Sequence, residues 1–184
     1  MVAREEMVTT PDGEMLTFIF HPEHDCPHPV VLYLMDAPSI RPALKDMASR
    51  LATAGYDVML PYLFYRGGQF REFSMSDEDM HQRRELMGAV TPTSIIGDGE
   101  ALLRVADADP NARHGKIGAV GFCMSGGWCD NDATAPALDA AGVVNTVDFL
   151  TEAEHGFAPA GPRYDRAASE PHWERVHSLL RRNL

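Results

Sequence analysis

Apolar residues alternate between short continuous runs and stretches of helical spacing in the first third of the chain. Residues 29–35 and 56–60 are almost entirely apolar, as is typical of strands buried on both faces of a parallel sheet. Between them, residues 41–54 place apolar side chains on one helical stripe, and Gly55 ends the predicted helix. A strand, a helix and a strand with short joints predict a βαβ unit. We therefore expect an α/β fold with a mostly parallel sheet and helices on both faces.

The flanking segments supply the remaining elements of a single domain over residues 1–184. A Pro-Asp-Gly turn between two short runs predicts a hairpin over residues 6–20. Ser76 and Thr91 stand where they would cap helices, and residues 143–150 predict a late strand. The last helix is expected from about Ser169 to the end of the chain.

A further apolar run ends in Gly121-Phe-Cys-Met-Ser-Gly-Gly127, in which Cys123 has a small residue two positions to either side. This pattern is typical of the nucleophile elbow of α/β-hydrolases, where a buried strand turns sharply into a helix. Side chains at the flanks would clash in such a turn, so Gly121 and Ser125 need to be small. The pattern predicts Cys123 as the nucleophile and the Met124 N–H as one oxyanion donor.

Two plainer interpretations of this stretch stay open. A free cysteine is most often a small buried hydrophobic residue, and glycines after a strand also form phosphate-binding turns. The strand, expected from Lys116, is followed by neither a Walker lysine nor a Gly-x-Gly-x-x-Gly run, which weakens the phosphate interpretation. The elbow interpretation gains support from a histidine further along the chain.

A thiol nucleophile needs a base, and His155 is the best placed of the eight histidines. It follows the predicted late strand and precedes Gly156 and the terminal helix, which is where α/β-hydrolases place the catalytic histidine. Three other histidines are expected on the surface: His114, His172 and His177. The order Cys, acid, His asks for a carboxylate between residues 123 and 155. Four candidates lie there: Asp130, Asp132, Asp139 and Asp148.

Together these motifs resemble the dienelactone hydrolase family of Cys-dependent α/β-hydrolases. The resemblance rests on the elbow, on Glu154-His-Gly-Phe157 and on Leu34-Met-Asp-Ala-Pro38. It implies that Cys123 is the nucleophile and His155 the base. It further implies that Asp132, which stands in an Asp-x-x-x-Pro context, orients His155.

The strand-end loops would surround the thiol. In α/β-hydrolases the loop after the strand at residues 29–35 supplies the second oxyanion N–H, and Ala37 is the expected donor. Asp36 stands where members of the family often carry a Glu that touches the thiol. The resemblance thus implies that Asp36, with Phe157 of the histidine motif, contacts the substrate. The alternative is that Asp36 caps its own loop, which is the ordinary role of Asp at a strand end.

The spacing of the acid departs from the family pattern. Asp132 follows Cys123 by nine residues, whereas a parallel crossover takes about ten to twelve residues or more. The resemblance implies a missing helix-strand-helix-strand stretch after Trp128 and a shorter missing piece after Pro136. The fold would then be incomplete between residues 128 and 137. A deletion in the native chain and joined segments of a longer chain are both open explanations.

Composition narrows the class of partner. The net charge of −11 and the lack of a basic patch argue against nucleic acids and anionic membranes. No apolar run reaches membrane-spanning length, and the N-terminal residues lack a signal-peptide core, so a cytoplasmic protein is expected. Three cysteines do not suggest a disulfide framework.

The loop over residues 21–28 contains possible metal ligands: His21, His24, Cys26 and His28. Its two prolines, and the absence of a matching ligand cluster elsewhere in the sequence, favour a solvated connector. We accordingly expect neither a metal nor a cofactor.

The resulting hypothesis is a hydrolase that cleaves a small ester or lactone with a Cys-His-Asp mechanism. The best-known lactonases of the family carry an Arg four residues after the histidine, where this chain has Pro159. Two alternatives stay open. One is a glutamine amidotransferase-like Cys-His enzyme, although Met124-Ser-Gly126 departs from the Gly-x-Gln usual after that cysteine. The other is a catalytically impaired binding protein of the same fold.

Overall fold

The computed structural model describes residues 1–74, 76–126, 140, 142–145 and 153–184. In this part of the chain a five-stranded sheet has the spatial order β1-β2-β4-β3-β5. The strands span Val2–Thr10 (β1), Gly13–His21 (β2), His28–Leu34 (β3), Asp57–Pro61 (β4) and Ala112–Gly121 (β5). β3 runs parallel to both β4 and β5, whereas β2 is antiparallel to β1 and β4. The sheet is therefore a parallel βαβ core extended by an antiparallel hairpin, in agreement with the predicted fold class.

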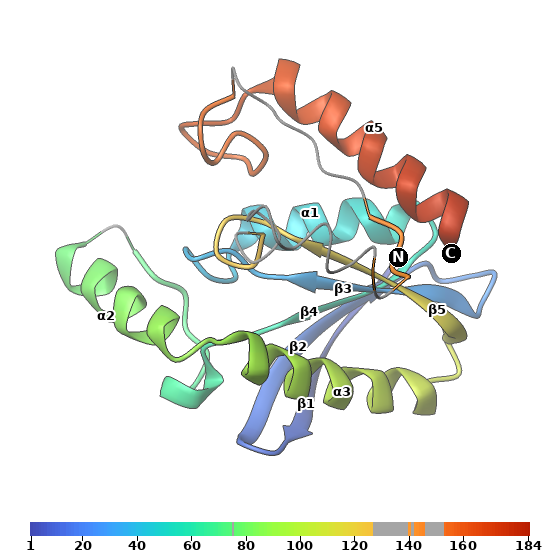
Figure 1. Cartoon of the computed structure of the whole chain (residues 1–184), viewed down its shortest axis with the longest axis horizontal. Helices are drawn as coiled ribbons and strands as arrows, with labels where there is room; N and C mark the ends of the chain where they lie inside the picture. Colours follow the sequence, from blue (N-terminus) through green and yellow to red (C-terminus); the bar gives the residue numbers. More distant parts are fainter. Residues whose placement is uncertain (75, 127–139, 141, 146–152) are drawn as a thin grey trace.

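Helices cover both faces of this sheet, as the sequence predicts. They span Pro42–Thr53 (α1), Asp77–Gly88 (α2), Pro92–Ala108 (α3) and Arg166–Asn183 (α5), with a 3₁₀ turn at Tyr65–Gly67 (η1). Figure 1 shows α1 and α5 on one face of the sheet and α3 on the other. None of the helices in the described ranges is both long and apolar enough to cross a bilayer.

The helix starts follow from local capping. The Ser76 hydroxyl accepts the Asp79 N–H at 3.2 Å, and Thr91 forms a capping box with Ser94. α5 begins three residues before the expected Ser169. Its start is set by Asp165, whose carboxylate accepts two backbone N–H groups of the first turn.

Two strand predictions need correction. β5 begins at Ala112 rather than Lys116, because its first half is exposed and polar and gives no apolar signal. Of the strand expected over residues 143–150, the structure describes only 143–145. These three residues lie outside any strand, and Val144 is 63% exposed. The rest of that expected strand lies outside the described residues.

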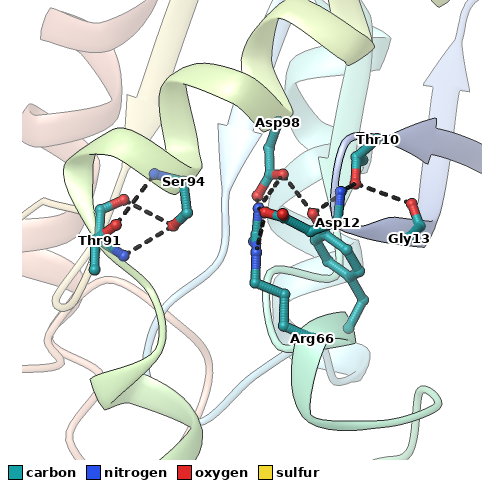
Figure 2. Close-up of polar contacts among 8 residues, drawn as sticks. Thr10, Asp12, Gly13, Arg66, Thr91, Ser94 and Asp98 are labelled. Atoms are coloured by element: carbon teal, nitrogen blue, oxygen red, sulfur yellow. Dashed lines mark hydrogen bonds and ion pairs between the residues drawn. The ribbon is translucent and has the colours of Figure 1, made fainter.

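A buried polar network fastens α3 to the hairpin and to the loop after β4 (Figure 2). The Asp98 carboxylate is 1% exposed and accepts two hydrogen bonds from the Arg66 guanidinium, at 2.8 and 2.9 Å. The Tyr65 hydroxyl donates to the same carboxylate at 2.7 Å and shares a further hydrogen bond with Thr10. Arg66 also reaches Asp12 in the hairpin turn. Burial first, and then the bond to Asp98, raise the pKa of Tyr65 to about 12, so the phenol remains a donor.

Asp98→Asn should lower the free energy of unfolding by about 3 kcal/mol, because it leaves the largely buried Arg66 guanidinium without its main counter-charge. Asp12→Asn is the matched control. That carboxylate also pairs with Arg66 but is 54% exposed, so its loss should cost no more than about 1 kcal/mol. Urea unfolding monitored by circular dichroism measures both values. Equal losses for the two variants would contradict the central role of Asp98.

Candidate active site

The turn after β5 has the backbone geometry expected of a nucleophile elbow. Cys123 adopts a φ of 53°, a left-handed conformation that non-glycine residues rarely occupy. The Ser125 N–H bonds to the Phe122 carbonyl at 3.2 Å and closes the turn around the cysteine. Strained backbone of this kind gathers at active sites, where the surrounding structure maintains it.

The glycines near the cysteine lie so close to the backbone of the turn that a side chain there would clash. A Cβ atom on Gly121 would lie 3.1 Å from the carbonyl carbon and oxygen of Ser125. A Cβ on Gly126 would lie 3.1 Å from the Gly121 carbonyl oxygen. Because the atoms in the way belong to the backbone, a side chain at Gly121 or Gly126 would have to push the turn itself apart.

Ser125 has a second role that its small size alone does not reveal. Its side chain is buried, and its hydroxyl contacts the Leu34 carbonyl at 3.1 Å and the Met35 carbonyl at a shorter distance. β3 and β5 pair so that Leu34 lies opposite Gly121. The serine therefore ties the elbow to the loop that contains Asp36 and Ala37.

The two predicted oxyanion donors stand in these two neighbouring loops. Ala37 and Met124 are each half-buried. No described residue accepts a hydrogen bond from either backbone N–H. Both amides thus have the hydrogen-bonding capacity that an oxyanion hole needs, although their role stays a prediction.

Asp36 has a partner that the sequence analysis did not consider. Its carboxylate is buried and accepts both ends of the Arg41 guanidinium, at 2.7 and 2.9 Å. Arg41 also donates to the backbone carbonyl of Ser39, and the Ser39 N–H donates to the backbone carbonyl of Asp36. The arginine five residues after the aspartate was the available signal. Burial first, and then the Asp36 charge, raise the pKa of neighbouring Tyr33.

The loop that carries His155 is joined to the elbow through aromatic packing. The His172 ring of α5 lies 5.4 Å from Phe122 in the elbow and 5.7 Å from Phe157 in the loop, both edge-on. Trp173, 1% exposed, packs against Phe122 and His172. His172 was expected on the surface but is half-buried, because Phe122 and Phe157, which come from other segments of the chain, pack against its ring.

His155 itself is exposed, and its backbone carbonyl accepts a hydrogen bond from Arg163 at 3.5 Å. Among the described residues no hydrogen bond joins its ring to the Cys123 thiol. Catalytic hydrogen bonds are often long in the absence of substrate. Its role as the base, and the substrate contact of Phe157, stay predictions.

The third predicted triad member cannot be placed. Asp132 and the junctions after Trp128 and Pro136 lie outside the described residues. The spacing argument and the choice among the carboxylates after the elbow therefore stay predictions.

Part of the histidine-rich loop converges at the opposite end of the sheet. His21, Cys26 and His28 each offer a ligand atom within 4.8 Å of the other two. His24 is exposed and does not belong to this group. The sequence favoured a solvated connector, yet the structure buries His21 and His28 at the ends of β2 and β3.

Known proteins share parts of this sequence and this fold. Carboxymethylenebutenolidases of Pseudomonas putida and Pseudomonas knackmussii are each 27% identical over 116 residues, which is 62% of this chain and 49% of theirs. The chain spans only 41% to 49% of the length of the curated relatives it matches. A solved dienelactone hydrolase-like promiscuous phosphotriesterase from metagenomic libraries has a TM-score of 0.75. Its alignment covers 99% of this chain and 98% of that one at 18% identity, which is a likeness of fold alone.

The sequence model of the Dienelactone hydrolase family matches residues 15–141, which is more than half of the chain. This range includes most of the hairpin strand β2, the βαβ unit and the elbow. The chain therefore belongs to the dienelactone hydrolase family.

Proposed function

We propose that this protein hydrolyses a small carboxylic ester or lactone with Cys123 as the nucleophile. The observation that carries the proposal is the positive φ of Cys123, in a turn that Ser125 anchors to the end of β3. Membership of the dienelactone hydrolase family supports the same reaction class. The chain spans less than half the length of its curated relatives, so the activity of the whole protein is itself part of this proposal.

The chemistry divides between the two loops. The Cys123 thiolate attacks the substrate carbonyl carbon, and the negative charge that forms on oxygen is stabilised by the Ala37 and Met124 N–H groups. Collapse of this intermediate breaks the C–O bond and leaves a thioester. His155 takes the thiol proton and passes it to the departing alkoxide. His155 then removes a proton from water, which cleaves the thioester and regenerates the thiol.

Asp132 would hold the His155 ring in the required tautomer, as the acid does in other triads. Asp36 would shape the pocket through Arg41, because its carboxylate is already engaged by that guanidinium. The cytoplasmic location expected from the sequence is part of the same proposal. The reaction requires neither a metal nor an organic cofactor.

The substrate is proposed to be neutral. Pro159 stands where the family's best-known lactonases have the Arg that binds a carboxylate. A net charge of −11 also repels anions at long range.

Cys123→Ala should abolish hydrolysis of p-nitrophenyl acetate and remove iodoacetamide labelling at residue 123, because no other group replaces the nucleophile. Cys129→Ala is the matched thiol control and should keep nearly full turnover. Initial rates and peptide mass spectrometry provide the two readouts. Full esterase activity in Cys123→Ala would overturn the mechanism, and ammonia release from glutamine by the intact chain would favour the amidotransferase alternative.

Gly121→Ala should lower kcat at least tenfold and destabilise the fold by about 1–3 kcal/mol, because the added methyl presses on the backbone of Ser125. Gly99→Ala in α3 is the control. A Cβ there meets nothing within 4 Å, and alanine favours the helix by about 0.5–1 kcal/mol. Esterase rates and thermal unfolding test both. An unchanged Gly121→Ala enzyme would mean that the elbow is not tightly closed.

A neutral lactone should be hydrolysed with a kcat/KM at least equal to that of a matched dienelactone carboxylate. The missing arginine and the negative field of the protein both act against the anion. Parallel assays at low and at 0.5 M salt separate the two causes, because salt screens only the long-range field. A strong preference for the carboxylate at both ionic strengths would contradict the proposed specificity.

A further inference from the structure

The three residues that converge at the far end of the sheet come from two strands and the loop between them. His21 ends β2, His28 begins β3, and Cys26 lies in the connecting loop. The Cys26 sulfur is 3.5 Å from Nε2 of His28, and the two histidine rings have centroids 6.2 Å apart. In a tetrahedral zinc site with bonds of about 2.0–2.3 Å, neighbouring ligand atoms are separated by roughly 3.3–3.8 Å. The Cys26–His28 pair already has this separation.

Hydrogen bonds from neighbouring groups orient the three side chains that could bind a metal. Nδ1 of His21 lies 2.7 Å from the Pro22 carbonyl oxygen, so in the neutral ring this nitrogen carries the proton and Nε2 offers the lone pair. A backbone carbonyl at the other ring nitrogen is what metal-binding histidines ordinarily have. The Cys26 thiol donates to Oδ1 of Asn111 at 3.2 Å, and the Asn111 carbonyl accepts the His28 N–H at 2.7 Å. The segment before β5 thus supports both the cysteine and the second histidine.

A buried carboxylate on the same face supplies an independent observation. Asp57 at the start of β4 is 1% exposed, and neither of its carboxylate oxygens has a hydrogen-bond partner among the described residues. Phe20 pairs with Val58 and Val30 with Asp57. By strand alternation, Asp57, His21 and His28 therefore lie on one face of the sheet. A carboxylate buried without hydrogen bonds is costly, and a positive charge nearby reduces that cost.

We propose that His21, Cys26 and His28 bind a zinc ion, with Asp57 as the nearby compensating carboxylate. Two imidazole nitrogens and one thiolate form a donor set that zinc prefers, and they leave a fourth position for water. The thiolate and the carboxylate together balance the two positive charges of the ion. Cys26 is exposed, which opens a route for the ion from solvent.

This site is structural rather than catalytic. β3 separates it from the elbow by about 20 Å, since His28 begins the strand and Leu34 ends it near Cys123. Figure 1 shows the loop between β2 and β3 and the turn after β5 at opposite ends of the sheet. A bound ion would cross-link β2 to β3, which are separated by β4 in the sheet and share no ladder hydrogen bonds.

The test uses the untagged full chain, from which a chelator first removes any bound metal. The protein is then dialysed against Zn²⁺, and its zinc content is measured by elemental analysis. We expect one Zn²⁺ per chain and a raised Tm. Cys26→Ser and His28→Gln should lose binding, and Asp57→Asn should weaken it by about 10–100-fold. Co²⁺ in place of Zn²⁺ should show a thiolate charge-transfer band that Cys26→Ser removes.

Two controls make the result decisive. His24→Ala alters an exposed histidine of the same loop and should bind Zn²⁺ like the parent chain. Cys123→Ala removes the elbow thiol and should also retain binding. Failure of the parent chain to bind Zn²⁺, or equal binding by Cys26→Ser, would overturn the proposal. Because Cys26 is exposed, its substitution is not expected to unfold the chain, and circular dichroism checks this directly.

Discussion

The parallel pairing of β3 with β5 is the constraint on which the candidate active site depends. Because of this pairing, both strands finish at the same end of the sheet, with Leu34 opposite Gly121. The Ser125 hydroxyl adds a link that the strand ladder does not supply, because it bonds to the carbonyls of Leu34 and Met35 at the end of β3. In the proposed mechanism, a substrate carbonyl above Cys123 meets amides from both loops only while this link holds.

Both faces of the sheet are fastened by side-chain contacts, and those on the α5 face reach the strained turn. On one face, Phe122 lies within an aromatic cluster formed by His172 and Trp173 of α5. On the other, the Asp98 carboxylate fixes α3 to the loop after β4 and to the hairpin. A left-handed cysteine costs of order 1–3 kcal/mol, which the surrounding structure has to offset. The packing of α5 against Phe122 therefore holds the residue next to Cys123 in place.

The two ends of the sheet hold different chemistry. The carboxyl ends of β3 and β5 present the cysteine and the amides of the proposed hydrolase site, as is usual for open α/β sheets. The opposite end gathers two buried histidines, a thiol and a buried carboxylate that has no hydrogen-bond partner among the described residues. Both sites use cysteine, but Cys123 itself has a left-handed backbone, whereas the Cys26 sulfur has histidine and asparagine neighbours. Sulfur thus serves as a proposed nucleophile at one end and a proposed ligand at the other.

Local sequence was sufficient for features that depend on neighbouring residues. The sequence correctly predicted the helix caps at Ser76 and Thr91, the hairpin turn, the βαβ unit and the need for small residues around Cys123. Steric contacts and hydrogen bonds within a few residues decide these features. Only the tertiary structure decided which distant groups meet. It paired Asp36 with Arg41, enclosed His172 among aromatic rings, and brought His21 and His28 together at the strand ends. These contacts depend on strand register and on how the elements pack, and neither is encoded in the spacing of residues along a single segment.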